Sequence, residues 1–213
     1  MRVLVTGAAG NIGSVLCPDP EAVHAAFAGA DRDGGLDAVV HLAGIPTEAP
    51  LPDILDSHVR STGVLLDEMV EHSVPRVVFA SSNHAVGFTP RSELLRTEAP
   101  ARPDTLYGVG KVAAEALLRL YADRHGLSAI AIRISRFLPR PETRRHLSTW
   151  LSHDDAVRMV DACLSAPDPG FAVLYGVSAN TRGWWDLEPG RRFGAARRGW
   201  ASSTTHVGLA FGA

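Results

Sequence analysis

Tyr107 and Lys111 are the two residues of this sequence whose types and spacing most directly indicate catalysis. Residues four positions apart lie on the same face of a helix. An isolated phenol has a pKa of about 10 and is a poor base at neutral pH, but a nearby ammonium group favours the phenolate. The pair therefore predicts a tyrosine that accepts a proton from a substrate, with Lys111 lowering its pKa. The same spacing also arises by chance, as an interfacial tyrosine beside a surface lysine.

Polar residues directly follow an apolar run that predicts a buried strand. Val77-Val78-Phe79-Ala80 leads into Ser81-Ser82-Asn83, and polar groups at the carboxyl end of a parallel strand lie at the ligand crevice. Taken alone, these polar residues could equally cap a helix or form a turn. Because they precede the tyrosine–lysine pair and follow a glycine-rich loop, we predict a ligand site that includes Ser81, Ser82 and Asn83.

The glycine-rich loop is the sequence TGAAGNIG at residues 6–13, which follows the first apolar run. Its small residues would let the backbone approach a pyrophosphate, and a helix N-terminus offers free N–H groups there. The spacing of the glycines is weak evidence alone, but its place after the first strand favours a nucleotide loop over a structural turn. The predicted cofactor-binding residues in it are Gly7, Ala9, Gly10, Asn11, Ile12 and Gly13.

Short apolar runs alternate with helix-like segments, which predicts an α/β fold with a Rossmann-like parallel sheet and helices on both faces. Strands are predicted at residues 2–6, 38–42, 76–80, 128–134 and 172–174. Helices are predicted at residues 19–27, 112–121 and 155–164. For the last helix, Ser152 is a candidate N-cap with Asp155 as an aspartate variant of the capping box.

The interval between the glycine-rich loop and the second predicted strand is short. Only 23 residues separate Gly13 from Asp37, whereas a complete dinucleotide fold has its second and third strands there. Pro18 and Pro20 interrupt the first helix, because proline disrupts a helix interior. We therefore expect one further helix and no second or third strand. The first strand would then lie at or near a sheet edge, where unpaired backbone groups favour self-association.

The same shortening affects the adenosine end of a dinucleotide. The acidic residue that holds the adenosine ribose normally ends the second strand, about 20 residues after the loop. Asp31 and Asp33 fall at that distance, but they follow the predicted helix. We interpret both as solvated loop acids and expect half of the cofactor site to be missing.

Composition excludes several function classes. With 46% hydrophobic and 21% charged residues and a net charge of −2, the chain resembles an ordinary soluble protein with no electrostatic reason to bind nucleic acid or a membrane. Neither the two cysteines nor the nine histidines form a ligand pattern, so no metal is expected. No apolar run could span a bilayer, and the glycine loop starts too early for a signal peptide, so we expect a cytoplasmic protein. One domain is predicted at residues 1–189, with a substrate-binding part at about 135–189 and a divergent tail at 190–213.

The order of the motifs TGAAGNIG, HLAG, SSNH and YGVGK resembles the extended short-chain dehydrogenase/reductases, the NAD-dependent epimerase/dehydratase superfamily. Within it, the chain is similar to the uronate dehydrogenases through SSNHAVGF (81–88), RRHLSTWLSHDD (144–155) and GVSANTRGWWD (176–186). The resemblance covers residues 1–16 and 19–188. It implies NAD-dependent oxidation of a hexuronic acid, such as glucuronate or galacturonate, at C1 to the aldonolactone.

The resemblance also implies roles for individual residues. Tyr107 would take the hydroxyl proton, Lys111 would also hold the nicotinamide ribose, and Ser82 would hydrogen-bond the reacting oxygen. The matching substrate-binding positions further include Asn83, His84 and Arg145, whose guanidinium suits a carboxylate. The cofactor would also contact the HLAG segment, at Leu42, Ala43 and Gly44. Relatives of this kind are commonly oligomeric, so a homo-oligomer is a further expectation.

Some positions depart from the family pattern. Pro46 replaces a substrate-facing hydroxyl, His58 replaces a helix asparagine, and Ser135-Arg136 replaces a Gly-Ser pair near the expected nicotinamide. Two other interpretations therefore stay open. One is a nucleotide-sugar epimerase or dehydratase, for which the short C-terminal region leaves little room. The other is a non-catalytic remnant that keeps the site but binds NAD poorly.

Overall fold

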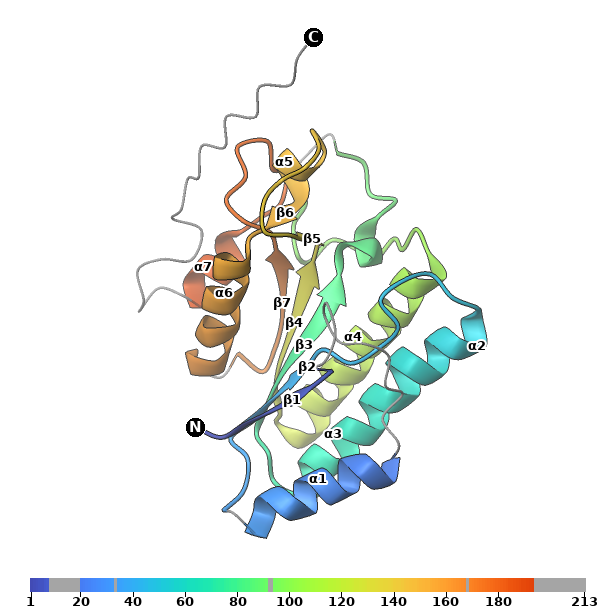
Figure 1. The fold of residues 1–213 in the computed structure, drawn as a ribbon, viewed down its shortest axis with the longest axis vertical. Helices are drawn as coiled ribbons and strands as arrows, with labels where there is room; N and C mark the ends of the chain where they lie inside the picture. The colour runs from blue at the N-terminus through green and yellow to red at the C-terminus, as the bar shows by residue number, and fades with distance from the viewer. Residues whose placement is uncertain (8–19, 33, 92–93, 168, 194–213) are drawn as a thin grey trace.

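A computed structural model describes residues 1–7, 20–32, 34–91, 94–167 and 169–193 (Figure 1). The glycine-loop residues from Ala9 to Gly13, together with Asp33, lie outside the described residues. So do residues 194–213, which make up most of the predicted tail.

The centre of the fold is a five-stranded parallel sheet in the order β1-β2-β3-β4-β7. The strands are β1 (Val3–Thr6), β2 (Ala38–His41), β3 (Arg76–Ser82), β4 (Ser128–Ile134) and β7 (Phe171–Gly176). All five strands were predicted from the sequence. Two are longer than predicted, because β3 continues to Ser82 and β7 begins at Phe171 and ends at Gly176.

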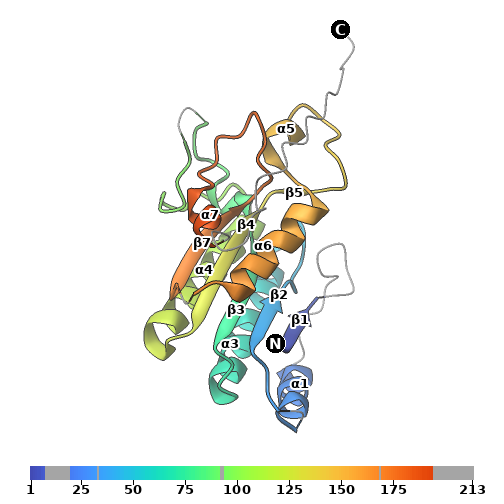
Figure 2. The ribbon, with the colours of Figure 1, turned by 90° about the vertical axis from the view of Figure 1, so that its left-hand side faces the viewer.

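Helices cover both faces of this sheet, as predicted (Figure 2). One face carries α1 (Pro20–Arg32), α3 (Ser61–Glu71) and α4 (Leu106–His125), and the other carries α6 (His153–Ser165) and α7 (Glu188–Phe193). On the first face, Phe27, Leu66 and Leu118 pack in one buried apolar cluster. Met159 and Cys163 pack in another on the opposite face. Strands β2, β3 and β4 are buried on both sides, which explains their largely apolar sequences, whereas Val5 on β1 is exposed.

Residues 51–71 form a continuous helical run that sequence periodicity missed. It consists of α2 (Leu51–Ile54), η1 (a π-helix, Leu55–Arg60) and α3. A π-helical turn shifts the face that points inward by an extra residue per turn. This breaks the regular 3.6-residue pattern and lets Ser57 and His58 both be buried.

The segment at the carboxyl ends of the strands is built from short elements. η2 (a 3-10 helix, Asn83–Val86) follows β3, and β5 (Arg136–Phe137) pairs with β6 (Trp150–Leu151) beside α5 (His146–Thr149). Ser152 caps α6 by accepting a hydrogen bond from the Asp155 amide at 3.0 Å, as predicted. In a capping box the Asp155 carboxylate would accept a hydrogen bond from the Ser152 amide. Here Ser178 lies between them, and its hydroxyl accepts from the Ser152 amide and donates to the Asp155 carboxylate.

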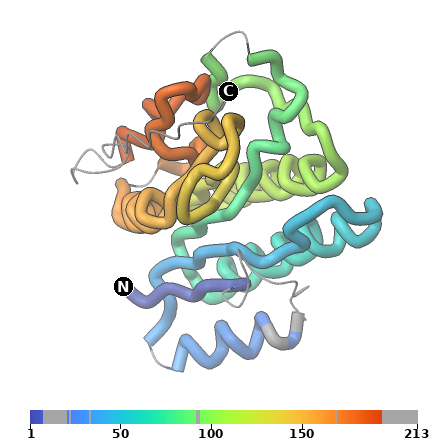
Figure 3. Tube along the Cα trace, turned by 45° about the horizontal axis from the view of Figure 1, so that its top comes forward, coloured from blue at the N-terminus to red at the C-terminus, as the bar shows by residue number. Residues whose placement is uncertain are grey.

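The two ends of the described chain differ from the sequence prediction in extent. Helix α1 continues to Arg32 rather than ending near Phe27. Helix α7 crosses the boundary predicted at residue 190, and Gly190 is buried. Figure 3 shows α1 and the α6–α7 segment on opposite sides of the molecule. Among the described residues, β2 is the hydrogen-bonded neighbour of β1, and no described helix is both long and apolar enough to cross a membrane.

Candidate active site

A cleft of about 560 Å³ opens where β2, β3 and β4 end. The structure brings most of the predicted site residues to this one cleft. Those that line it are Leu42, Gly44, Ser82, Asn83, His84, Tyr107, Lys111 and Arg145. Three residues noted as departures from the family pattern, Pro46, Ser135 and Arg136, line it as well. The predicted tyrosine and lysine therefore line the same cleft as Ser82 and Arg145.

The N-terminus of α4 positions Tyr107. The Thr105 hydroxyl caps the helix by accepting a hydrogen bond from the Gly108 amide at 2.9 Å. The Glu48 carboxylate accepts from the amides of Leu106 (2.9 Å) and Tyr107 (3.1 Å). A carboxylate is stabilised at a helix N-terminus by the free N–H groups and by the helix dipole. Glu48, which sequence reasoning did not identify, thereby ties the loop after β2 to the catalytic helix.

Gly108 brings the same helix against η2. A Cβ atom at this position would lie 2.5 Å from the carbonyl oxygen of His84. Only glycine permits this approach, which sets Tyr107 beside the residues that follow β3. The ring of His84 meets the Tyr107 ring edge-on, with centroids 5.8 Å apart.

Lys111 is buried beneath the cleft floor. Its Nζ atom donates a hydrogen bond to the carbonyl oxygen of Ala80 at 2.8 Å and lies 5.6 Å from the centroid of the Tyr107 ring. Burial lowers the pKa of Lys111 to about 7, while the negative charge of Glu115 acts in the opposite direction. Burial therefore makes the charged form of this lysine less favourable than it is in water, and Glu115 offsets part of that cost.

The pKa of Tyr107 differs from the sequence prediction. Burial raises it above the ordinary value for tyrosine, and a side-chain hydrogen bond with Ser82 partly opposes that rise. The predicted net lowering by Lys111 is wrong for this structure. The physical reason is that desolvation of the phenolate outweighs the favourable interactions, and the lysine is itself desolvated.

Ser82 is held by the turn that follows β3. Its Oγ accepts a hydrogen bond from the His84 amide at 3.2 Å and donates to the Asn83 side-chain oxygen at 3.4 Å. His84 is oriented by Asp104, whose carboxylate oxygen lies 2.7 Å from His84 Nδ1. Ser82, Asn83 and His84 thus line one cleft. Asp104 orients His84, and no motif in the sequence pointed to it.

His58 on η1 packs against the ring of Tyr107. With Nε2 protonated, it donates to the carbonyl oxygen of Ile45 at 3.1 Å, and its ring packs edge-on against Tyr107 with centroids 5.3 Å apart. Burial lowers its pKa to about 3, so the imidazole is neutral. Two glycines make room for this ring. A Cβ on Gly44 would lie 2.5 Å from His58 Cε1, and one on Gly110 would lie 3.1 Å from Cδ2.

A buried ion pair underlies the catalytic helix. Arg133 on β4 donates two hydrogen bonds to Glu115 on α4, at 3.0 and 2.8 Å, and the Ser81 hydroxyl donates a third at 2.5 Å. Both charged side chains are less than a tenth exposed. Glu115 lies one turn beyond Lys111, and this i, i+4 spacing was the one available sequence signal for it. The pair fixes α4 to the carboxyl ends of β3 and β4.

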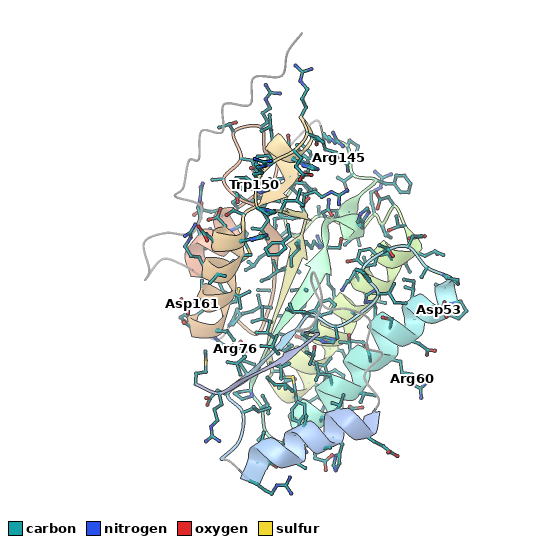
Figure 4. All side chains as sticks on the ribbon, in the orientation of Figure 1. Asp53, Arg60, Arg76, Arg145, Trp150 and Asp161 are labelled. Carbon is teal, nitrogen blue, oxygen red and sulfur yellow. The ribbon has the colours of Figure 1, made fainter. Side chains whose placement is uncertain are left out.

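The opposite wall of the cleft comes from the segment after β4. Arg145 is exposed and lies at the end of the molecule that carries α5 (Figure 4). The backbone there is fixed because its carbonyl oxygen accepts hydrogen bonds from the Thr149 hydroxyl and the Ser148 amide, both at 3.1 Å. Arg136 also reaches the cleft and is exposed. The lining of the cleft therefore includes two exposed arginines from this segment.

The described residues fit the nicotinamide end of a dinucleotide. Gly7 has a φ of +73°, and a Cβ there would lie 2.7 Å from the Ala43 amide nitrogen, so the chain after β1 passes directly over the end of β2. Gly44 has a φ of +139°. Gly44 lines the cleft together with Lys111, whereas Gly7 and Ala43 are not among the residues that line it. Asp31, in contrast, contacts His72 between α1 and α3 and does not line the cleft.

Comparison with known proteins identifies the family. Residues 19–153 match the model of the NAD dependent epimerase/dehydratase family. The uronate dehydrogenase of Agrobacterium fabrum is 40% identical, over 87% of this chain and 80% of the relative. That of Pseudomonas syringae is 37% identical, over 87% and 77%. This chain belongs to the uronate dehydrogenase family.

Solved structures of uronate dehydrogenases share its fold. The crystal structure of uronate dehydrogenase from Agrobacterium tumefaciens superposes with a TM-score of 0.82 at 38% identity, covering 91% of this chain and 82% of that one. Glucuronic acid dehydrogenase from Chromohalobacter salexigens gives 0.82 at 33% identity, covering 94% and 85%. The family membership agrees with the resemblance that the sequence motifs predicted.

Proposed function

We propose that the chain oxidises a hexuronic acid at C1, with NAD as the oxidant, and releases the aldonolactone. The observation that carries this proposal is the meeting of Ser82, Tyr107 and Lys111 with Arg145 around one cleft, in a chain whose relatives are uronate dehydrogenases. A relative that is a UDP-glucose 4-epimerase, from Azospirillum brasilense, is 34% identical but covers only 48% of this chain. The epimerase interpretation is therefore the weaker one.

Each residue has a defined task in this reaction. Tyr107 takes the proton of the C1 hydroxyl, and Ser82 donates a hydrogen bond to the same oxygen, which stabilises negative charge as it develops. The positive form of Lys111 would act against the rise that burial causes in the Tyr107 pKa, and it would hold the ribose next to the nicotinamide. NAD, when bound, supplies the hydride acceptor. His58 remains neutral beside Tyr107 because of its low pKa. It therefore places no second positive charge near the ammonium group of Lys111.

The substrate end of the cleft suits a sugar acid. A guanidinium binds a carboxylate through two parallel hydrogen bonds. We assign this role to Arg145, with Asn83 and His84 binding sugar hydroxyls. Because Asp104 fixes the His84 ring, that side chain meets the sugar in one orientation.

The cofactor-binding residues follow from the same arrangement. Tyr107 and Lys111 would hold the nicotinamide ribose, and Leu42, Ala43 and Gly44 would line the path of the dinucleotide. The pyrophosphate would lie on the loop that starts at Gly7, with Ala9, Gly10, Asn11, Ile12 and Gly13 as its binding residues.

We further propose that the chain lacks the second and third strands of the complete fold. Helix α1 lies in the interval where they would occur, and β2 is the strand paired with β1 in the part of the chain that the structure describes. The adenosine end of NAD would then have few partners, and NAD affinity would be low. The free side of β1 would favour self-association into a homo-oligomer. We place the enzyme in the cytoplasm.

Binding of NAD tests the proposal independently of turnover. Isothermal titration of the full chain with NAD is expected to show saturable binding. Lys111→Met should weaken it strongly, and Tyr107→Phe should weaken it much less, because that substitution keeps the ring and removes only one hydroxyl. Absence of saturable binding would favour the non-catalytic remnant and reject the enzyme.

A further inference from the structure

Helices α1 and α3 bring two histidines and two carboxylates together on the side of the sheet that carries β1. Helix α3 contributes Glu68 and His72, four residues apart and so on one face. Helix α1 contributes His24 and Asp31, which are seven residues apart and again share a face. The two helices pack against each other through the buried ring of Phe27 and its neighbours. None of these four side chains lines the cleft.

The separations of the potential ligand atoms match a metal coordination shell. His24 Nδ1 lies 3.1 Å from Glu68 Oε2, and His72 Nε2 lies 3.4 Å from the same oxygen. Around a tetrahedral ion with bonds of about 2.0–2.2 Å, neighbouring ligand atoms are about 3.3–3.5 Å apart. The ligand atoms of the three residues all lie within 4.8 Å of one another. The longest of these separations would have to shorten when an ion binds, through movement of the His24 side chain, which is 57% exposed.

His72 is already oriented as a metal ligand would be. Its Nδ1 atom is 2.6 Å from the Asp31 carboxylate. With Nδ1 as the proton donor in this contact, the neutral ring would carry its lone pair on Nε2. That Nε2 atom is buried and has no hydrogen-bond partner. A buried nitrogen lone pair without a partner is costly, and a metal ion would satisfy it. Carboxylate–histidine–metal arrangements of this kind are the usual outer shell of zinc sites.

We propose that His24, Glu68 and His72 bind a divalent transition-metal ion of the zinc class, with Asp31 orienting His72 and water at the fourth position. Two imidazoles and one carboxylate form a borderline donor set that suits Zn²⁺ and Co²⁺ better than Ca²⁺ or Mg²⁺. No metal was expected from the sequence, because these residues are separated by up to 48 positions and form no short-spaced motif. Only the packing of α1 on α3 brings them together.

The place of the site in the fold indicates a structural role. Helix α3 ends at Glu71, shortly before β3 begins at Arg76, so this end of α3 lies at the amino ends of the strands (Figure 1). The catalytic cleft lies at their carboxyl ends. The ion would therefore join α1 to α3 beside β1, at the opposite end of the sheet from the reaction.

Metal titration of the full chain tests this proposal. The protein is prepared without a histidine tag, treated with a chelator and dialysed. Zn²⁺ binding is measured by calorimetry and Co²⁺ binding by visible absorption. Thermal unfolding is followed with and without Zn²⁺. The variants are Glu68→Gln, His72→Gln and Asp31→Asn. The matched control is His125→Gln, which removes an exposed histidine from the end of α4.

The expected result is one Zn²⁺ per chain, intense Co²⁺ absorption of a four-coordinate site, and a higher unfolding temperature with Zn²⁺. Glu68→Gln and His72→Gln should abolish all three effects, and Asp31→Asn should weaken affinity about 10–100-fold, while His125→Gln matches the unsubstituted chain. Circular dichroism of the metal-free variants shows whether they fold. Absence of stoichiometric binding in the unsubstituted chain would overturn the proposal, as would unchanged binding by folded Glu68→Gln and His72→Gln.

Discussion

The buried pair of Glu115 and Arg133 gives the sharpest prediction about how the catalytic helix is held. Glu115→Gln keeps the size of the side chain but removes its charge, leaving Arg133 buried with only a neutral partner. The pair has two hydrogen bonds, at 3.0 and 2.8 Å, and both side chains are less than a tenth exposed. Removing one partner of such a pair costs about 3–5 kcal/mol. For a domain of this size, that corresponds to a fall in Tm of roughly 6–20 °C.

The control for this prediction is on the same helix. Asp123 pairs with Arg119 at 2.9 Å, but both side chains are about 60% exposed, so Asp123→Asn should change stability by less than about 1 kcal/mol. Urea unfolding followed by circular dichroism measures both variants. The double variant Glu115→Gln/Arg133→Leu should lose less than the sum of the two single substitutions, because it leaves no buried charge. Equal stability of Glu115→Gln and Asp123→Asn would refute the reasoning.

The same substitution bears on catalysis. Glu115 raises the pKa of Lys111, which burial has lowered to about 7. Without the carboxylate, the pKa of Lys111 should fall further, and a smaller fraction of the lysine is positive at neutral pH. We expect the activity of the folded variant to fall at pH 7. An unchanged pH profile would show that Glu115 does not act on the lysine.

Three further predictions concern acid stability, the substrate and the fit behind Tyr107. Burial holds the pKa values of His41 and His58 at about 3, against about 6.5 in the unfolded chain. Below pH 6.5 the unfolded state therefore binds more protons than the folded state. Each histidine should cost up to about 1.4 kcal/mol of stability per pH unit as the pH falls from about 6.5 toward 3. A urea unfolding midpoint that is constant from pH 7 to 5 would contradict this. Arg145→Ala should raise KM for a hexuronate much more than KM for NAD, and an unaltered hexuronate KM would remove the arginine from the substrate site. Gly110→Ser should lower stability, because its Cβ would lie 2.5 Å from Ile54 Cγ2. Adding His58→Asn should not restore stability, since the contact with Ile54 remains. Full recovery of stability in the double variant would show that the added side chain clashes with His58 and not with Ile54.

The sequence was a good guide to features that depend on local pattern. The strand at residues 128–134 was predicted with its observed bounds, because apolar runs buried on both faces are easily recognised. The Ser152 cap depends on a spacing of three residues and was also predicted. Tyr107, Lys111 and Ser82 were selected because motif order places them at strand ends and on one helix face.

Features that depend on packing between distant segments could not be predicted in the same way. Glu48 reaches the N-terminus of α4 from a loop nearly 60 residues earlier. The raised pKa of Tyr107 follows from burial, which motif spacing does not report. The π-helical turn at His58 breaks the periodicity by which helices are recognised.

Formation of NADH from NAD and a hexuronic acid tests the central claim most directly. We expect the purified chain to reduce NAD with glucuronate or galacturonate, to produce the aldonolactone in equal amount, and to show little activity with glucose, which lacks the carboxylate. Tyr107→Phe should abolish the reaction while the chain stays folded. No NADH with either uronate at saturating NAD, or the same rate in Tyr107→Phe, would contradict the account.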